Sequence, residues 1–320
     1  MNVTLQSEDG PCTASTWRRT IRHTLRAALV AGVTGLCLVS GAEAPASAAA
    51  LSPTPFGDMD GDGWSDLLVR NTTSGDLTLY RGTRGGLRAP LRVGRGWNGM
   101  DAITRHGDMD GDGHEDVVAR EARTGALWLY PGTGTSGEIS PAFARRLRIG
   151  AGGWNAMKEI TPAGDLDGDG RGDLLAVRAA TGELFLYPGR GASLGRPRLF
   201  GRGWSAMDEL TGMGDIDHDG HVDLLARQMD TGDVWAYPAT GFGSSARLGA
   251  RTMVGAGAAG WRRMDSFAGL GDVDRDGWND LVAVDAFAAW TSRVYGLRNG
   301  RLQAVSEYGP GWRRHLRPIL

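Results

Sequence analysis

Residues 58–66 read Asp-Met-Asp-Gly-Asp-Gly-Trp-Ser-Asp, and this pattern decides the fold because the chain carries it five times. Each copy follows a glycine, and the copies begin at Gly57, Gly107, Gly164, Gly214 and Gly271. Successive copies are therefore 50, 57, 50 and 57 residues apart. A period in this range predicts a repeat architecture in which each unit packs against its neighbours.

Each unit reads as four short strands separated by turns. In the first unit an apolar run follows the acidic loop at 66–70, and an alternating segment ending in Tyr follows at 77–80. A shorter segment at 91–93 comes next, and then a Gly-Trp pair opens a segment of the form W-x-x-M-x-x-[IL] at Trp97. Apolar faces with a 3.6-residue period are lacking, which argues against helical repeats. Four strands in about 50 residues are typical of a propeller blade.

The two ends of the repeat region complete each other. The first unit starts at its acidic loop, whereas residues 311–319 resemble the Gly-Trp strand that this unit lacks. The sequence therefore predicts an all-β, five-bladed β-propeller over residues 51–320, closed by pairing of the N- and C-terminal segments. The fifth unit has a longer apolar link at 286–291 in place of the Thr-Gly turn, so its third strand is the least defined.

The acidic loops have the composition of a metal site. Aspartate occupies their first, third, fifth and ninth positions: Asp58, Asp60, Asp62 and Asp66; Asp108, Asp110, Asp112 and Asp116; Asp165, Asp167, Asp169 and Asp173; Asp215, Asp217, Asp219 and Asp223; Asp272, Asp274, Asp276 and Asp280. The seventh residue would contribute its backbone carbonyl and is variable: Trp64, His114, Arg171, His221 and Trp278. Oxygen ligands at alternate positions of a sharply turned loop suit Ca²⁺. We expect about five calcium ions with a structural role.

Three other interpretations of the loops are weaker. An EF-hand requires Glu at the twelfth position between two helices, but Val69 and its equivalents stand there in strand-like runs. Magnesium prefers to keep several waters, for which four carboxylates leave little room. An Asp-rich turn without metal would leave the carboxylates repelling one another in all five copies.

Residues 1–50 differ from the rest and predict a cleaved secretory signal peptide. Four arginines precede the uncharged stretch 27–42, and small residues at 46–50 form a cleavage site. A transmembrane anchor would need a longer apolar run, and no other stretch comes closer. Both cysteines, Cys12 and Cys37, lie in this segment, so the mature chain would lack disulfides. We expect a secreted protein with no membrane span after cleavage.

Charge and motifs narrow the partners. The formal net charge is −2, and 34 of the 35 basic residues are Arg, with Lys158 the exception, so a basic nucleic-acid footprint is missing. No nucleophile elbow, zinc-protease or phosphate-loop motif occurs, and we predict no catalytic residues. A carboxylate pair assembled across loops stays open, with Glu115, Glu159 and Glu209 as first candidates.

The loops and their strand context resemble the FG-GAP (integrin α-type, also called VCBS-type) repeats of calcium-binding β-propellers, over residues 57–320. The units are most similar to secreted actinobacterial repeat proteins, although integrin propellers have seven blades. The resemblance implies a non-catalytic binding or scaffold module, expected as a monomer, for a glycan, a cell-wall polymer or an extracellular protein. The alternatives are an extracellular hydrolase or lyase built on a propeller, and a structural envelope protein.

The repeated tryptophans have two interpretations. Trp97, Trp154, Trp204, Trp261 and Trp312 could stack on sugars, but packing within or between blades is favoured because large aromatic side chains dominate cores. Trp64 and Trp278 beside the loop tips, and Trp128 and Trp235 on strands, are weaker candidates for exposed contacts.

Overall fold

The computed structural model describes residues 57–84, 86–137, 141–285, 291–307 and 316–319. The predicted signal peptide at 1–50 lies outside these residues, as does Trp312. In the described part of the chain, no helix is long and apolar enough to cross a membrane.

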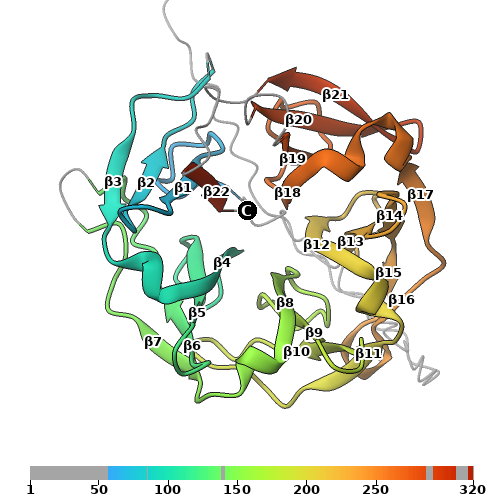
Figure 1. The fold of residues 1–320 in the computed structure, drawn as a ribbon, viewed down its shortest axis with the longest axis horizontal. Helices are drawn as coiled ribbons and strands as arrows, with labels where there is room; N and C mark the ends of the chain where they lie inside the picture. Colours follow the sequence, from blue (N-terminus) through green and yellow to red (C-terminus); the bar gives the residue numbers. More distant parts are fainter. Residues whose placement is uncertain (1–56, 85, 138–140, 286–290, 308–315, 320) are drawn as a thin grey trace, which may run out of the picture. The chain divides into compact units, whose positions relative to one another are not determined.

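Five four-stranded antiparallel sheets make up the fold, and we number these blades I to V (Figure 1). In spatial order blade I contains β22 (Leu316–Ile319), β1 (Leu67–Asn71), β2 (Leu77–Tyr80) and β3 (Leu91–Gly94). Blade II contains β4 (Met100–Gly107), β5 (Asp116–Glu121), β6 (Leu127–Tyr130) and β7 (Leu147–Gly150). Blade III contains β8 (Met157–Pro162), β9 (Leu174–Arg178), β10 (Leu184–Tyr187) and β11 (Arg198–Gly201). Blade IV contains β12 (Met207–Gly214), β13 (Asp223–Gln228), β14 (Val234–Tyr237) and β17 (Thr252–Gly255), and blade V contains β18 (Met264–Gly269), β19 (Asp280–Asp285), β20 (Thr291–Arg298) and β21 (Arg301–Glu307).

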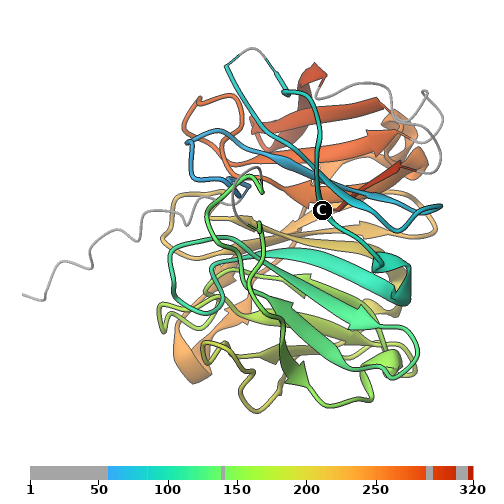
Figure 2. The ribbon, with the colours of Figure 1, turned by 90° about the vertical axis from the view of Figure 1, so that its left-hand side faces the viewer.

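The blades follow one another around a common axis, with the first strand of each sheet nearest to it (Figure 1). Successive sheets lie in stacked layers when the molecule is seen from the side (Figure 2). A small extra hairpin, β15 (Ala239–Thr240) with β16 (Arg247–Leu248), extends blade IV. The prediction of an all-β, five-bladed propeller is confirmed.

The second strand of each blade is buried on both faces, which explains its unbroken apolar sequence. Leu67, Leu68 and Val69 of β1 are all fully buried. Because side chains alternate along a strand, Leu68 packs toward blade II, whereas Leu67 and Val69 pack toward blade V.

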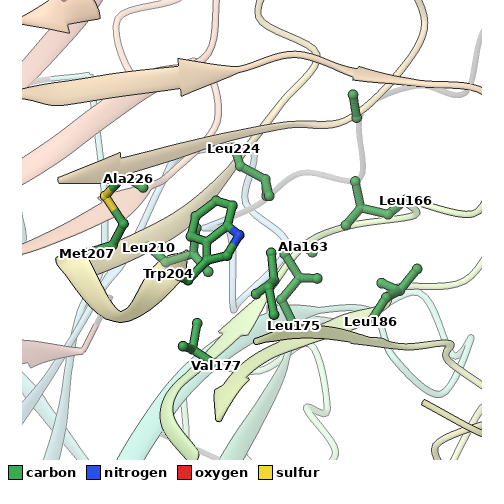
Figure 3. Packing of buried hydrophobic residues seen from close by; sticks show 12 residues of the cluster. Ala163, Leu166, Leu175, Val177, Leu186, Trp204, Met207, Leu210, Leu224 and Ala226 are labelled. Atoms are coloured by element: carbon green, nitrogen blue, oxygen red, sulfur yellow. The ribbon is translucent and has the colours of Figure 1, made fainter. Parts of the chain in front are cut away.

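Five clusters of buried side chains lie between adjacent blades and form the core. In the cluster between blades III and IV, Trp204 is 4 % exposed and packs among Leu175, Met207 and Leu210 (Figure 3). Its ring centroid lies 4.9 Å from that of Tyr237. The other described tryptophans of this series pair with tyrosines in the same way: Trp97 with Tyr130, Trp154 with Tyr187, and Trp261 with Tyr295. These four tryptophans are therefore packing residues and present no face to a sugar.

The Gly-Trp segments correct one detail of the prediction. The tryptophans lie in short 3-10 turns, η1 (Trp97–Gly99), η2 (Trp154–Ala156), η3 (Trp204–Ala206) and η6 (Trp261–Arg263), and each strand begins only at the following methionine. Two further 3-10 turns are η4 (Gly243–Ser245) and η5 (Gly257–Ala259). A turn is needed here because the chain leaves the outer strand of one blade and enters the inner strand of the next.

Basic side chains hold these turns from the preceding blade. Arg120 Nη1 donates to the carbonyl oxygens of Trp154 and Met157 at 2.9 and 2.7 Å, and its Nε pairs with Asp101. Lys158 takes this role for the next turn, with Nζ donating to the carbonyl oxygens of Ser205 and Met207. Arg70 and Arg227 act similarly in blades I and IV. These three arginines thus join adjacent blades, and Arg120 and Arg227 also pair with the acids Asp101 and Asp208.

Blade I is built from distant parts of the chain. Strand β22 pairs antiparallel with β1, and Leu68 lies opposite Ile319. Blade V, whose third strand was least defined by the sequence, has an eight-residue β20 in that place.

Candidate metal centres

The five acidic loops occupy the same place in every blade. Each of loops II (108–116), III (165–173), IV (215–223) and V (272–280) joins the first strand of its blade to the second. Loop I (58–66) leads directly into β1. The sixth residue of every loop is a glycine with φ between 83° and 92°, for instance Gly63 at 83°. Side chains rarely adopt this left-handed conformation, which explains the glycine.

The first aspartate of each loop organises the turn. In loop I, Asp58 Oδ1 accepts from the backbone N–H groups of Gly61 and Asp62 at 2.8 and 3.1 Å. Its Oδ2 accepts from the N–H of Gly63 at 2.7 Å. The equivalent bonds from the sixth residue recur in the other four loops at 2.7 to 2.9 Å. These bonds curl the backbone of each loop around its first aspartate.

The ninth aspartate anchors the loop to its own blade. Asp66 is fully buried, and its Oδ2 accepts from the N–H of Met59 at 2.9 Å. Its Oδ1 accepts from the N–H of Gly82, beyond β2, at 2.8 Å. The first three of the other ninth aspartates make matching contacts 16 residues on: Asp116 to Gly132, Asp173 to Gly189 and Asp223 to Ala239. Burial raises the pKa of all five ninth aspartates to about 7.

Each loop brings three carboxylates close enough to hold one ion, with ligand atoms within 4.8 Å of one another. Loops I and V use the first, third and fifth positions: Asp58, Asp60 and Asp62; Asp272, Asp274 and Asp276. Loops II, III and IV use the first, third and ninth: Asp108, Asp110 and Asp116; Asp165, Asp167 and Asp173; Asp215, Asp217 and Asp223. Asp112, Asp169 and Asp219 lie outside these triplets, as do Asp66 and Asp280. The structure thus brings together three of the four predicted carboxylates in every loop.

The seventh residues are placed beside the carboxylates through their backbone. The N–H of Trp64 donates to Asp62 Oδ1 at 3.0 Å. The same bond to the fifth aspartate recurs at the other seventh residues: His114, Arg171, His221 and Trp278.

Electrostatics favour a cation at these triplets. Burial, reinforced by the neighbouring fifth-position carboxylate, raises the pKa of Asp60, and the same two causes act on Asp110, Asp217 and Asp274. A raised pKa means that the negative charge is poorly compensated by the protein alone. All the triplet donors are carboxylate oxygens, the ligand type that hard divalent cations prefer. The residues present therefore fit a metal ion such as calcium.

Two arginines that sequence reasoning missed lie against the loops. Arg190 Nη1 is 2.9 Å from Asp169 Oδ2, and Arg298 Nη2 is 2.6 Å from Asp276 Oδ2 and 3.2 Å from Asp274 Oδ2. Arg190 lies between β10 and β11, whereas Arg298 ends β20. Each belongs to the same blade as the loop that it contacts but is distant from that loop in sequence, so only the three-dimensional fold reveals the contact.

An axial cavity of about 290 Å³ lies between the inner strands. Glu159 and Glu209 both line it, together with Thr161 and Thr211. Burial raises the pKa of Glu159 to about 7, and burial with the nearby Glu159 charge raises the pKa of Glu209 to about 8. Both glutamates stand five residues after a repeat tryptophan, a shared position that the sequence already displayed.

Glu115, the third candidate for a carboxylate pair, lies elsewhere. It is buried and forms an ion pair with Arg105. It therefore has a structural role between blades I and II.

Sequence comparison supports the nature of the repeats. A family model described as an FG-GAP-like repeat matches residues 108–176 and 165–226, so the chain carries FG-GAP-like repeats in these two places. No curated protein matches the sequence.

The solved structures that match the chain share little sequence with it. The Tc holotoxin pore of Photorhabdus luminescens matches with 16 % identity and a TM-score of 0.42, over 82 % of this chain and 12 % of that one. A nidogen/laminin complex matches with 10 % identity and a TM-score of 0.48, over 79 % of this chain and 96 % of that one. BBS1N in complex with ARL6DN matches with 10 % identity and a TM-score of 0.38, over 81 % and 82 % of the two chains. The chain thus spans about an eighth of the length of the toxin chain.

Proposed function

We propose that residues 51–320 form an exported, calcium-binding module that binds a glycan, a cell-wall polymer or an extracellular protein and catalyses no reaction. The observation that carries this proposal is the recurrence of a carboxylate triplet in all five loops. Five ions would fill them, with the fourth carboxylate and the seventh carbonyl completing each set. Residues 1–50 would direct export and be removed, and the mature chain would act as a monomer.

In this proposal the ions stabilise the propeller and take no part in a chemical reaction. Extracellular calcium modules bind with Kd of about 10⁻⁴–10⁻³ M. At about 1 mM calcium, a site with a Kd of about 10⁻⁴ M stabilises the folded state by about 1.4 kcal/mol. Loops fixed in this way would present a rigid surface, which lowers the entropy lost on binding.

Binding of the mature chain to an array of glycans, cell-wall polymers and matrix proteins tests the proposal. We expect binding in 1 mM calcium, loss of binding in chelator, and ligand that is recovered chemically intact. Circular dichroism in both buffers separates loss of the fold from loss of the site. Binding that is equal in calcium and chelator would contradict the calcium-dependent module.

The hydrolase or lyase alternative has one specific observation in its favour, the convergence of Glu159 and Glu209 on the axial cavity. Two carboxylates of raised pKa in one cavity resemble the acid and base of glycoside cleavage. Release of reducing ends from array ligands would support this alternative, provided that Glu159→Gln and Glu209→Gln each abolish it. Intact ligands after prolonged incubation favour the binding module.

A further inference from the structure

The fourth position of the acidic loops separates them into two kinds. Loops I, II and III have glycine there, with positive φ at Gly61, Gly111 and Gly168. Loops IV and V have His218 and Arg275 instead, which retain the same left-handed conformation at φ 63° and 62°. A residue with a Cβ is disfavoured in this conformation, so these two side chains must be retained for another reason.

Arg275 reaches from loop V to loop I. Its guanidinium carbon lies 3.5 Å from the ring centroid of Trp64, a cation–π contact. Its Nη2 also donates to the carbonyl oxygen of Gly63 at 2.6 Å. One side chain thus contacts two consecutive residues of the neighbouring loop, at the boundary between blades V and I.

His218 makes the corresponding contact one blade earlier. Its ring stacks on Trp278 of loop V with a centroid distance of 3.9 Å and an interplanar angle of 11°. In both cases the fourth residue of one loop contacts the seventh residue of the next.

In the sequence, the type of residue at the fourth position of one loop also corresponds to the type at the seventh position of the next. Tryptophan occupies the seventh position only in loops V and I, the two loops that follow a loop with a non-glycine fourth residue. The loops that follow a glycine-bearing loop have His114, Arg171 and His221 there. Neighbouring atoms leave room for a side chain at two of these glycines, because a Cβ added at Gly61 or Gly111 would meet nothing within 4 Å; only the positive φ favours glycine there.

We propose that Arg275 and His218 couple the metal loops of blades IV, V and I, so that a cation bound in one loop raises the cation affinity of the next. This inference rests on the proposed metal binding. Arg275 lies between Asp274 and Asp276, so an ion held by these carboxylates fixes the backbone from which Arg275 extends. Arg275 in turn fixes two residues of loop I: Trp64, which would provide the seventh-position carbonyl, and Gly63, which precedes it.

Such coupling is reciprocal, because affinities of linked sites change by the same factor in both directions. An ion in loop I therefore also favours the ordered position of Arg275. Since β22 and β1 complete blade I beside this boundary, the same contact holds the first and last repeats together.

The experiment follows the calcium dependence of hydrogen exchange in the peptide covering 57–66, with loop V intact or disabled by Asp274→Asn and Asp276→Asn. In the otherwise unchanged mature chain, we expect disabling loop V to raise the calcium concentration that protects loop I by about 5-fold or more. In Arg275→Gly, which installs the glycine that loops I to III use, we expect loop I to need more calcium from the start. Disabling loop V should then have no additional effect on loop I.

Two controls accompany the measurement. Arg123→Gly removes an exposed arginine from the turn between β5 and β6, at the end of β5 opposite loop II, and should leave loop I unchanged. Thermal melting in chelator verifies that every variant is folded.

If the calcium concentration that protects loop I is the same with loop V intact and disabled, the coupling is overturned, but the proposed metal binding is still supported. The same holds if disabling loop V weakens loop I equally in Arg275→Gly. Absence of any calcium-dependent protection in the unchanged chain would overturn both the coupling and the proposed metal binding.

Discussion

The Arg105 guanidinium and the Glu115 carboxylate form a two-pronged ion pair, with Nε–Oε1 at 2.6 Å and Nη2–Oε2 at 2.7 Å, and each side chain is only 1 % exposed. Arg105 Nη1 also donates to the carbonyl oxygen of Asp66, and Glu115 Oε2 accepts from the N–H of Gly57. Two hydrogen bonds thus hold the pair together within blade II, and the other two join it to the start of blade I.

Breaking this pair on one side should be costly. Glu115→Ala leaves an uncompensated charge on buried Arg105, and we expect a loss of about 3–5 kcal/mol in the free energy of unfolding. Urea denaturation measures the loss. Asp101→Asn is the control, because its carboxylate pairs with Arg120 but is 41 % exposed and should contribute less than about 1 kcal/mol. The double change Arg105→Met with Glu115→Leu should cost less than Glu115→Ala, and an equal or greater cost would argue against the charge explanation.

Chelation should lower the melting temperature of the mature chain by at least about 10 °C if all five sites are filled at about 1 mM calcium. Differential scanning calorimetry across a calcium series measures the shift.

A single ligand change tests the origin of that shift. Asp110→Asn removes one triplet carboxylate whose pKa is raised by burial and by Asp112. We expect it to reduce the stabilisation by calcium, and to leave stability in chelator unchanged or slightly higher because a repulsion is lost. Equal destabilisation in both buffers would show that Asp110 acts without a metal.

The axial glutamates should make stability depend on pH. Their folded-state pKa values, about 7 for Glu159 and about 8 for Glu209, exceed the ordinary carboxyl value. Between the ordinary value and pH 8 the folded state thus holds more protons than the unfolded state, so stability falls as pH rises through this window. The double change Glu159→Gln with Glu209→Gln should raise the melting temperature by a few degrees at pH 8.5 and by much less at pH 5.

The measurement is made in saturating calcium, so that the protonation state of the loop aspartates stays the same at both pH values. A variant that gains as much at pH 5 as at pH 8.5 would contradict the raised pKa values.

Truncation of two tryptophans should destabilise the protein to very different extents. Trp204→Ala empties the cluster between blades III and IV and should cost about 3–5 kcal/mol. Trp278→Ala removes a side chain that is 39 % exposed, so we expect about 1 kcal/mol or less. Guanidinium denaturation in excess calcium compares the two. Similar losses in the free energy of unfolding would mean that Trp278 contributes more to core packing than its exposure indicates.

The fold was largely predictable because its determinants are local and repeated. The Gly-Asp loops and the apolar runs recur in all five units, and the closing tyrosines recur in the first four, so the interpretation of one unit applies to the others. The sequence does not distinguish the 3-10 turn at Trp97 from the strand that follows it, because three residues of turn leave no periodicity to detect.

The candidate sites were predictable only where their residues are close in sequence. Four carboxylates within nine residues are enough to identify each loop. They do not reveal which three carboxylates converge, and this choice differs between loops I and V and the other three loops. Arg275 and Trp64 are in contact but lie in the last and first acidic loops of the sequence, and no rule of sequence spacing predicts a contact over such a separation. The convergence of Glu159 and Glu209 was encoded in their common distance from Trp154 and Trp204, but it depended on knowing that inner strands line an axis.

The pairing of β22 with β1 also sets the order of folding events. Within blades II to V strands pair with the next strand in sequence, except that β15 and β16 intervene between β14 and β17. Leu68, by contrast, meets Ile319 only after all the intervening blades have been synthesised. Contacts of such long range form late because closing the intervening chain costs entropy. A nascent chain therefore cannot complete its ring while β22 is still in the exit tunnel, and ring closure is the last step in assembling the five blades.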